Sequence, residues 1–520
     1  MLIIERSDNY SARQGGARQG GTRQGVASIF VKYMHVFVML FLALSTTCAV
    51  RAEPWLDTRN VGLRVDIERL SNEGIITVPI NTWPLMWSSI LNDLDATDSK
   101  TVPSSLHASY ARVITAARAA TRTHKAQQSV RVSGANQSHV LLHFGDTGRD
   151  DAEFSLRRND MTEHFAYNLE ATRVVNPWDG EKQHYDNSYL GFVWGNWIAL
   201  VGSVERWWGP GWNSNLILSN NARPTLGASL QRNYSEPFDV PVLSWLGPWT
   251  TNLFIAKLDD ERVINNAKLI GMTVGFRPIP RLEINLRRTA QWGGDGRPET
   301  FSNFLELVTG LADNCGSSSC KAQEPGNQLG GIDVRWNLPW YNSALYWQTV
   351  GEDEAGGLPS KRASQVGLQF NFSGNGFDGI LFIEHDDTST KSSQARYNVL
   401  YNHSIYKTGY RYQGRAIGAT WDNDSQVTSL GAVGYLANGD RLEVLASYGE
   451  LNVDSIDGVG SMHSITTHGS KFNSFVTKWQ RPFLWGDIEL EGRYTDQQID
   501  QFGRQEDKLR AALTLNYKFD

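Results

Sequence analysis

The sequence predicts an all-β membrane protein, a large antiparallel transmembrane β-barrel that follows a small α-helical region. Three observations predict this class: an export signal, strand-like segments that alternate apolar and polar residues, and short turns that alternate with long polar loops. Together these features are typical of barrels in the bacterial outer membrane.

The last segment, Leu509–Phe519, has the clearest strand pattern of the chain. Alternate residues of a strand point to opposite faces of the sheet. One face is apolar and ends in two aromatic residues; it comprises Leu509, Ala511, Leu513, Leu515, Tyr517 and Phe519. The other face comprises Arg510, Ala512, Thr514, Asn516 and Lys518. This pattern favours a closing barrel strand with lipid outside and water inside, and the alternative is the edge strand of a soluble sandwich.

An apolar stretch over residues 36–44 has the character of the core of a secretory signal peptide. Lys32 precedes it, and the small or short residues Val50 and Ala52 fit the cleavage rule. We therefore expect Sec-type cleavage after Ala52, which places the mature start at Glu53.

The residues before this stretch are unlike a normal signal start. Three Arg-Gln-Gly repeats between Arg13 and Gly25 form a low-complexity leader, and Met34 is an alternative initiator. A lipoprotein signal at Cys48 is a rival interpretation, but Thr47 is too bulky for that processing. We assign residues 1–52 to leader and signal peptide and exclude them from the fold.

The overall composition fits a barrel and also fits some secreted proteins. Hydrophobic residues make up 40% and charged residues 20%, and the mean hydropathy is −0.38. After the signal, no apolar run reaches the roughly 20 residues of a membrane helix, which excludes a helical membrane protein. The 18 Trp, 18 Tyr and 21 Phe suit a barrel, which hides its lipid contact in alternate residues. A secreted carbohydrate-binding or hydrolytic protein would also be aromatic-rich.

Two cysteines, Cys315 and Cys320, remain after the signal. They flank a short polar stretch, and in an oxidising compartment we expect them to form a small disulfide loop. A metal site needs more ligands than this segment offers, so we expect none there. The formal net charge of −6 argues against a nucleic-acid partner.

Residues 53–127 differ from the rest of the chain because they follow a helical period. We expect a short helix around residues 63–70, ended by Gly74, and an Ala-rich helix within residues 103–123. The region is too small to bury much core alone. We expect it to form a helical periplasmic region that packs on the mouth of the barrel.

Residues 128–520 are predicted to form the outer-membrane barrel. The segments with the clearest period of two are 165–171, 282–287, 332–338, 366–373, 441–448 and 487–494. Charges of both signs recur on the face opposite the apolar one. This predicts a polar, hydrated interior, because a soluble barrel would pack its interior with apolar side chains.

The connections between these segments alternate in length. Tight turns are expected at 278–280, 374–376 and 437–440, and long polar loops near 291–330, 351–364, 386–394, 450–471 and 495–507. With a periplasmic C-terminus, all of these loops lie outside the cell. A strand count gives about 21, and bacterial barrels have even numbers, so at least one assignment is wrong. The least certain strand assignment is 225–232. If this segment is not a strand, residues 205–250 form one long connection, which lies on the periplasmic side or inside the lumen.

Three tryptophans among glycines and prolines mark the segment 205–224, which is the most unusual of the chain. The candidate polysaccharide-binding or plug residues are Glu205, Arg206, Trp207, Trp208, Trp212, Asn220, Asn221 and Arg223. Flat aromatic faces beside amide and guanidinium donors suit a sugar, and arginine suits an acidic sugar. The alternative is a structural plug or constriction held by buried tryptophans. Neither interpretation assigns a catalytic residue or a metal ligand.

Several motifs resemble the Wzi family of capsule assembly proteins. They are W-W-G-P-G-W at 207–212, L-I-L-S-N-N-A-R-P at 216–224, and L-R-x-D-I-x-x-L-x-x-x-G-I-I at 63–76 followed by T-W-P at 82–84. The resemblance extends from Trp55 to Phe519 and implies a barrel of about eighteen strands with a helical periplasmic portion.

The same resemblance implies an outer-membrane lectin rather than an enzyme, with no cofactor. Its role would be to attach or organise capsular or other exported polysaccharide at the cell surface. The partners then expected are this polysaccharide, outer-membrane lipid and the polysaccharide-export machinery.

Two other functions fit parts of the sequence. A pore for oligosaccharides or solutes would also have a polar, aromatic lumen, and channel conductance would distinguish it. The other function is an outer-membrane hydrolase, but the sequence contains no GxSxG or HExxH motif. The best cluster for acid–base work or a cation is 384–387 (Glu-His-Asp-Asp) at an expected strand end, and a solvated loop is the simpler interpretation.

Overall fold

The computed structural model describes residues 53–309, 326–339, 342–355, 358–374, 376–391, 395–458, 460–496, 500–501, 504–505 and 507–519. The expected leader and signal peptide and the expected disulfide between Cys315 and Cys320 lie outside these residues. Among the helices so described, none is long and apolar enough to cross a membrane.

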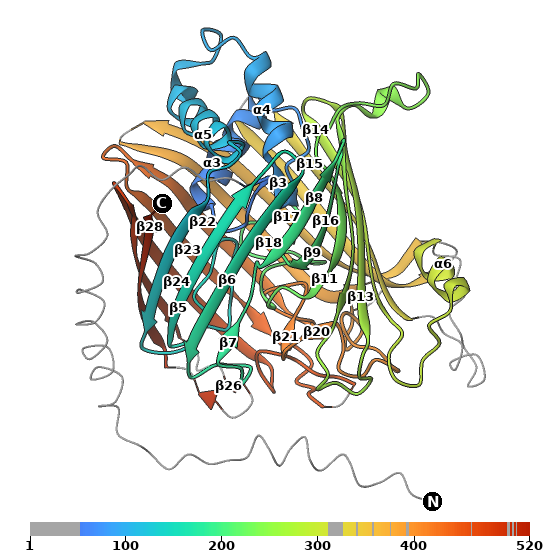
Figure 1. Ribbon diagram of the computed structural model, residues 1–520. Helices are drawn as coiled ribbons and strands as arrows, with labels where there is room; N and C mark the ends of the chain where they lie inside the picture. Colours follow the sequence, from blue (N-terminus) through green and yellow to red (C-terminus); the bar gives the residue numbers. More distant parts are fainter. Residues whose placement is uncertain are drawn as a thin grey trace, which may run out of the picture.

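Eighteen strands within these residues form a closed antiparallel barrel, which confirms the predicted fold class (Figure 1). The barrel closes where β28 pairs with β4, with Leu515 opposite Val132. The wall strands are β4 (Gln127–Ala135), β5 (Ala152–Met161), β6 (Phe165–Val175), β8 (Tyr189–Trp194), β9 (Trp197–Ser203), β11 (Leu226–Arg232), β12 (Trp249–Lys257), β13 (Lys268–Ile279), β14 (Leu282–Trp292), β15 (Gly326–Leu338), β16 (Ser343–Ala355), β17 (Leu358–Gly374), β18 (Phe377–Lys391), β22 (Gln426–Leu436), β23 (Arg441–Leu451), β24 (Ser470–Phe483), β25 (Gly486–Thr495) and β28 (Leu509–Phe519).

Shorter strands lie beside the wall or apart from it. Two of them, β7 (Gln183–His184) and β19 (Ala395–Arg396), extend the sheet beside β6 and β18 without adding a position to the wall. The others form small ribbons: β1 (Trp55–Leu56) with β3 (Leu85–Met86), β2 (Thr82–Trp83) with β10 (Trp207–Trp208), β20 (Arg411–Tyr412) with β21 (Arg415–Ala416), and β26 (Asp500–Gln501) with β27 (Arg504–Gln505).

The predicted count of about 21 strands was too high. The least certain of the predicted strands, 225–232, is nevertheless a strand, β11. Strand β11 pairs with β9 on one side and β12 on the other. Residues 205–250 are therefore two connections, one on each side of β11. The expected loops at 351–364 and 386–394 were also too long, because β16, β17 and β18 continue through much of them.

Side chains of the wall strands alternate between the outer face and the lumen, as expected. In β6, Leu169 points outward with 60% of its surface exposed, whereas its neighbour Asn168 points into the lumen and is fully buried. The last strand repeats the pattern, with Leu509 outside and Arg510 inside. The outer face is thus an apolar band of the kind that meets lipid.

The helical region covers one mouth of the barrel (Figure 1). It contains α3 (Val61–Asn72), α4 (Trp87–Ala96), the 3-10 turn η1 (Ser104–Leu106) and α5 (His107–Ala120). The predicted first helix and its glycine stop are present, since Gly74 has a positive φ of 75°. Helix α4 was missed, although apolar Trp87, Ile90 and Leu94 show its spacing.

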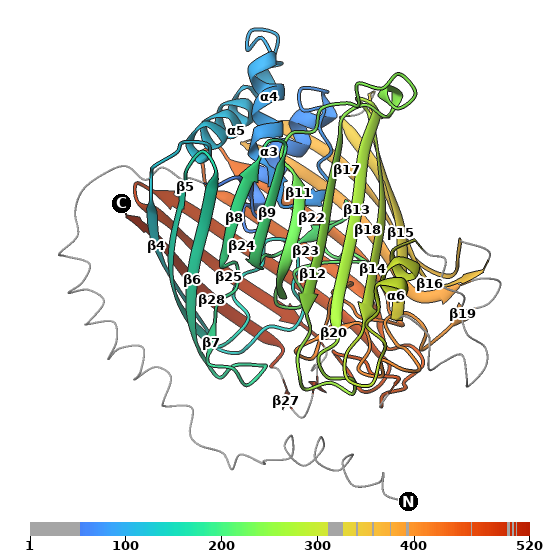
Figure 2. The same cartoon turned by 45° about the vertical axis from the view of Figure 1, so that its right-hand side comes forward.

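Two ends of the barrel can now be distinguished (Figures 1 and 2). The helical end carries α3–α5 and the short turns. Two contacts show this: Arg69 of α3 lies 3.9 Å from Asp378, just after the turn at 374–376, and the Arg112 guanidinium of α5 lies 4.0 Å from the ring of Tyr435, just before the turn at 437–440. The loop end carries β20, β21, β26, β27 and the short helix α6 (Phe301–Thr309). A further connection at the helical end, between β11 and β12, contains the 3-10 turn η2 (Ser244–Leu246).

If the outward band meets lipid, Leu430→Arg in the middle of β22 should lower the free energy of unfolding by about 2–4 kcal/mol, because it puts a charge near the bilayer midplane. Leu484→Arg, in the turn between β24 and β25, should cost only about 0–1 kcal/mol, because that exposed leucine lies at the end of the barrel. Urea unfolding in lipid vesicles measures both changes. Equal losses for the two variants would contradict a lipid-facing wall.

Candidate functional site

Residues 204–225, the lumen loop, leave the wall after β9 and return to it at β11. Between these strands the loop runs inside the barrel, where Trp207 and Trp208 of β10 pair with Trp83 and Thr82 of the helical region. Close packing requires a glycine at position 211, because a Cβ there would lie 2.2 Å from the Ser214 carbonyl oxygen. The loop and the helical region thus form one two-stranded ribbon within the lumen.

The three tryptophans of the lumen loop are core residues. Trp207 and Trp208 are fully buried and Trp212 is 4% exposed. The Phe144 ring meets Trp207 and Trp212 edge-on, with centroids 5.4 and 6.0 Å apart, and Trp212 stacks on Phe382 of the wall at 5.8 Å. Because these rings are buried, they have no free face for a sugar, which favours the plug alternative.

Arg64 of α3 holds the lumen loop from the side of the helical region. Its Nη2 donates to the carbonyl oxygens of Pro210 and Gly211, both at 2.8 Å, and its Nε donates to Glu68 at 2.7 Å. The guanidinium also lies 4.0 Å from the centroid of the Trp212 ring. A single buried cation therefore has a carboxylate, two carbonyls and an aromatic face as partners.

Glu384 of β18 holds the same stretch from the wall. The backbone N–H groups of Trp212 and Asn213 donate to its two carboxylate oxygens, at 2.5 and 2.9 Å. Tyr346 of β16 donates its hydroxyl to the same carboxylate at 2.7 Å. Carboxylates that accept several N–H and O–H donors are strong acceptors, so this contact fixes the loop against the wall.

Amide side chains of the wall satisfy more of the loop backbone. Gln348 accepts the N–H of Leu216 at 2.8 Å and donates to the carbonyl of Trp208 at 2.9 Å. Gln365 donates to the carbonyl of Ser214 at 2.9 Å. The interior is polar as predicted, and at this level its polar groups bind protein backbone.

The other predicted residues also serve the loop itself. Asn220 and Asn221 donate their side-chain amides to backbone carbonyls, those of His143 and Ala416, both at 3.0 Å. Glu205 accepts the Thr58 hydroxyl at 2.9 Å. Arg206 donates to the hydroxyl of Ser229 at 3.2 Å, and burial lowers its pKa to about 10, so it remains a cation at neutral pH.

Arg223 lies at the loop end, where three carboxylates surround it. Its guanidinium donates to Asp150 at 2.8 Å and to Asp179 and Asp186 at 2.7 Å each. Three carboxylates outweigh one guanidinium, so this arginine does not present a free positive charge to an acidic sugar. The structure therefore removes the reason for assigning Arg223 to acidic sugars.

Aromatic residues lie beside this cluster. Tyr185, next to Asp186, is 63% exposed. Burial and the nearby carboxylates of Asp259 and Asp186 raise the pKa of Tyr412 to about 12, so its hydroxyl stays protonated. We call Asp179, Asp186, Arg223, Tyr185 and Tyr412 the rim patch.

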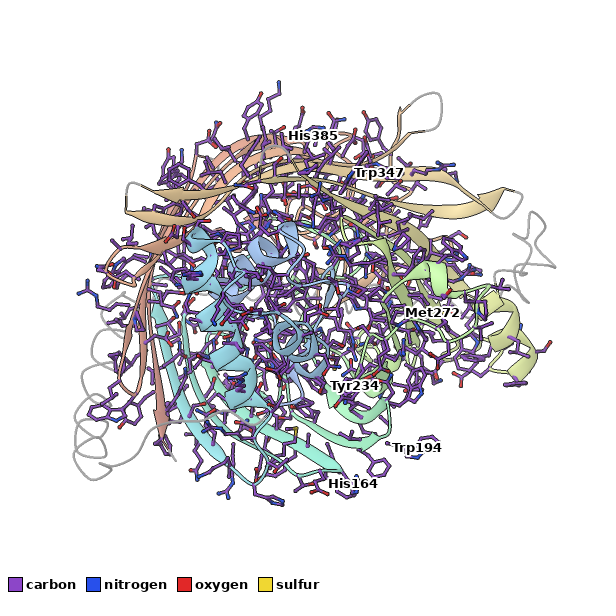
Figure 3. All side chains as sticks on the ribbon, turned by 90° about the horizontal axis from the view of Figure 1, so that it is seen from above. His164, Trp194, Tyr234, Met272, Trp347 and His385 are labelled. Atoms are coloured by element: carbon purple, nitrogen blue, oxygen red, sulfur yellow. The ribbon has the colours of Figure 1, made fainter. Side chains whose placement is uncertain are left out.

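The acidic cluster at 384–387 is not a solvated loop at a strand end, as the simpler interpretation had it. It lies within β18, and Glu384 and Asp386 are fully buried toward the lumen. Asp386 accepts Gln365 Nε2 at 2.7 Å and Trp421 Nε1 at 3.0 Å. His385 points to the outer side of the wall (Figure 3). Across the described ranges, no group of three or more His, Cys, Asp or Glu residues has the arrangement of a metal site.

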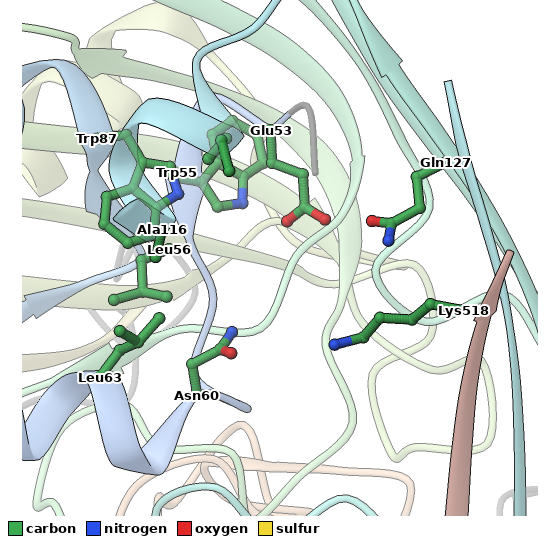
Figure 4. A pocket seen from close by; sticks show the side chains of 11 residues that line it. Glu53, Trp55, Leu56, Asn60, Leu63, Trp87, Ala116, Gln127 and Lys518 are labelled. Atoms are coloured by element: carbon green, nitrogen blue, oxygen red, sulfur yellow. The ribbon is translucent and has the colours of Figure 1, made fainter. Parts of the chain in front are cut away.

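A cavity of about 310 Å³ lies at the helical end, between the helical region and strands β4 and β28. Trp55 and Trp87 contribute an apolar side, and Gln127 and Lys518 approach from the opposite side (Figure 4). The Gln127 Nε2 has no hydrogen-bond partner among the described residues. The cavity is separate from the predicted site residues, none of which lines it.

Several residues that hold the site were missed by sequence reasoning. Arg64 lies in a predicted helix, but a helical period does not show that its side chain reaches a loop 146 residues away. Phe144 lies in a connection without periodicity, and Tyr346 and Gln348 belong to a strand whose inward face was not singled out. Glu384 had a signal, since it belongs to the acidic cluster singled out at 384–387.

Comparison with known proteins agrees with this architecture. A family model described as capsule assembly protein Wzi matches residues 121–512. The chain belongs to the Wzi capsule assembly family. This confirms the resemblance inferred from the lumen-loop and helical motifs.

Two relatives define the match further. The solved structure of Wzi from Escherichia coli, described as a carbohydrate-binding outer-membrane β-barrel involved in group 1 capsule assembly, superposes with a TM-score of 0.76 at 25% identity, over 91% of this chain and 99% of that one. An uncharacterized 55.8 kDa protein in the cps region of Klebsiella pneumoniae is 33% identical over 344 residues, 64% of this chain. The match spans 65% of that relative's length. The protein is thus an outer-membrane β-barrel of the Wzi family.

Arg64→Ala should lower the free energy of unfolding by about 3 kcal/mol, because it removes a buried cation beside Glu68, which keeps only Arg335 at 3.3 Å, and takes away the donor of the Pro210 carbonyl. Arg64→Lys should lie between this variant and the wild type, since lysine keeps the charge but lacks the fork that reaches both carbonyls. Urea unfolding in lipid vesicles measures the changes.

Arg118→Ala is the matched control, because Arg118 pairs with Asp95 on the exposed surface of the same helical region. It should cost at most about 1 kcal/mol. An Arg64→Ala loss no larger than that of the control would show that the clamp on the lumen loop does not hold the structure.

Proposed function

We propose that the protein attaches or organises capsular or other exported polysaccharide at the cell surface, as a lectin-like barrel without catalytic activity. The observation that carries the proposal is the superposition on E. coli Wzi along almost all of that chain, since that protein is described as a carbohydrate-binding barrel of capsule assembly. The family match over residues 121–512 supports the same role.

The arrangement of the lumen favours binding over passage. A pore needs a continuous aqueous path, and here the lumen loop and the helical region occupy the barrel with buried tryptophans and satisfied backbone groups. The polymer is therefore held at an end of the barrel rather than threaded through it. Long loops of outer-membrane barrels face outside, so the loop end is the cell-surface side and the helical region is periplasmic.

The rim patch is the surface at the loop end that best suits a sugar. Tyr185 offers an exposed aromatic ring, and Asp186, whose side chain is 20% exposed, offers an acceptor for hydroxyl donors. Because its carboxylates outnumber its arginine, the rim patch favours neutral sugar residues over uronic acids. The tryptophans of the lumen loop are buried and do not belong to this surface.

Deletion of the protein should lower cell-attached polysaccharide while polymer still accumulates in the medium, because retention and not synthesis is lost. In the deleted strain, Tyr185→Ala should restore retention only partly, with polymer affinity reduced about threefold to tenfold by the lost ring contact. Cell-bound and free polymer are measured after gentle sedimentation, and affinity by pull-down with outer membranes.

Trp245→Ala is the matched control, because Trp245 is an exposed aromatic residue in η2 at the opposite end. It should restore full retention. Unchanged attachment in the deleted strain would remove the proposed role, whereas equal retention by the Tyr185 and Trp245 variants would remove only the rim patch.

A further inference from the structure

Helix α6 lies outside the barrel, against the outer face of β13 and β14 (Figures 2 and 3). Its Leu307 is 1% exposed and packs against Ile270 and Ala290, which pair with each other across the two strands. Phe304, one turn before Leu307, packs in the same cluster beside Trp292. One side of the short helix is therefore seated on the wall.

The seat of α6 belongs to the lipid-facing side of the wall. Next to Ile270, Leu269 packs into the core cluster inside the lumen. Next to Ala290, Gln291 donates to the carbonyl of Gly409 inside the barrel at 2.8 Å. Since neighbouring residues of a strand point to opposite faces, Ile270 and Ala290 point outward, where the rest of the wall exposes apolar side chains.

The flank of α6 beside its contact with the wall is also apolar. Phe301 is 74% exposed and Leu305 is 44% exposed. These residues are four positions apart, so they lie next to each other on one face of the helix. Exposed aromatic and aliphatic surface of this kind is more stable in an apolar environment than in contact with water.

The strand ends beside α6 indicate its depth relative to the membrane. Lys268, the first residue of β13, and Trp292, the last residue of β14, lie opposite each other at the loop end, with the Lys268 ammonium 5.3 Å from the centroid of the Trp292 ring. Lys268 also pairs with Glu299 at 2.5 Å, just before α6. A tryptophan beside a charged pair is typical of the boundary between acyl chains and headgroups.

We propose that α6 is an interfacial anchor whose Phe301 and Leu305 insert among the acyl chains of the membrane leaflet at the loop end. The occupant is lipid, because α6 rests on residues of the lipid-facing band and its exposed face continues that band outward. This goes beyond polysaccharide binding: the anchor fixes residues 293–309, which follow β14, at the membrane surface.

The test replaces Phe301 with a benzophenone-bearing phenylalanine, which keeps an aromatic side chain, in the full chain in the outer membrane of intact cells. After illumination, mass spectrometry of the peptide that contains position 301 should show a gain of one lipid mass. The same residue at Leu286, which faces outward in the middle of β14, is the positive control, and at Tyr185 it is the control for a solvent-exposed position.

The proposal predicts lipid adducts at 301 in a yield close to that at 286 and far above that at 185. A yield at 301 no higher than at 185 would overturn it. A cross-link from 301 to a second copy of the chain or to another protein, without lipid adduct, would also overturn it, because a protein would then cover this face. Heat-dependent gel migration of each variant confirms that the barrel is folded.

Discussion

Arg64 and Glu384 grip consecutive pairs of residues in the lumen loop: Arg64 of the helical region binds 210–211, and Glu384 of the wall binds 212–213. The rest of the architecture depends on this grip, because eighteen strands enclose more space than inward side chains of the wall alone can fill. A loop inside such a space keeps its backbone only if its N–H and C=O groups find partners. Here a helix supplies the donor for two carbonyls, and a wall carboxylate supplies the acceptor for two amides.

The grip also makes the helical region and the barrel a single folding unit. Arg64 comes from α3, Glu384 from β18, and the loop between them from the connection of β9 to β11. Other wall residues extend the same arrangement: Glu283 accepts the backbone N–H groups of Ile80 and Asn81, both at 2.9 Å. The helical region therefore stays in the mouth through many wall contacts, and the two ends of the barrel become separate surfaces with separate roles.

The periodicity of the sequence was sufficient for much of this fold. The strand over 509–519, the two helices around 63–70 and 103–123, and the irregular character of 205–224 all follow from local patterns, which depend on residues within one or two turns of each other. Strand β11 was uncertain because its seven residues, Leu-Gly-Ala-Ser-Leu-Gln-Arg, include small residues that weaken the alternation.

The site resisted prediction for a different reason. Whether Trp207 stacks on a sugar or packs in a core depends on Phe144 and Trp83, which lie far away in sequence, and local composition suits either outcome. The same holds for Arg223, which looks like a ligand for acids until Asp150, Asp179 and Asp186 are seen around it. Residue type suggested which interactions these side chains can make, but their burial and their partners in the fold determine which interactions they do make.

Conductance of the purified protein in planar lipid bilayers tests the central claim most directly, because a clamped lumen loop leaves no continuous path for ions. The account predicts that insertion of the wild-type barrel produces no steady single-channel current. A stable open level, seen in the wild type at neutral pH and low voltage, would contradict it and would favour a pore for solutes.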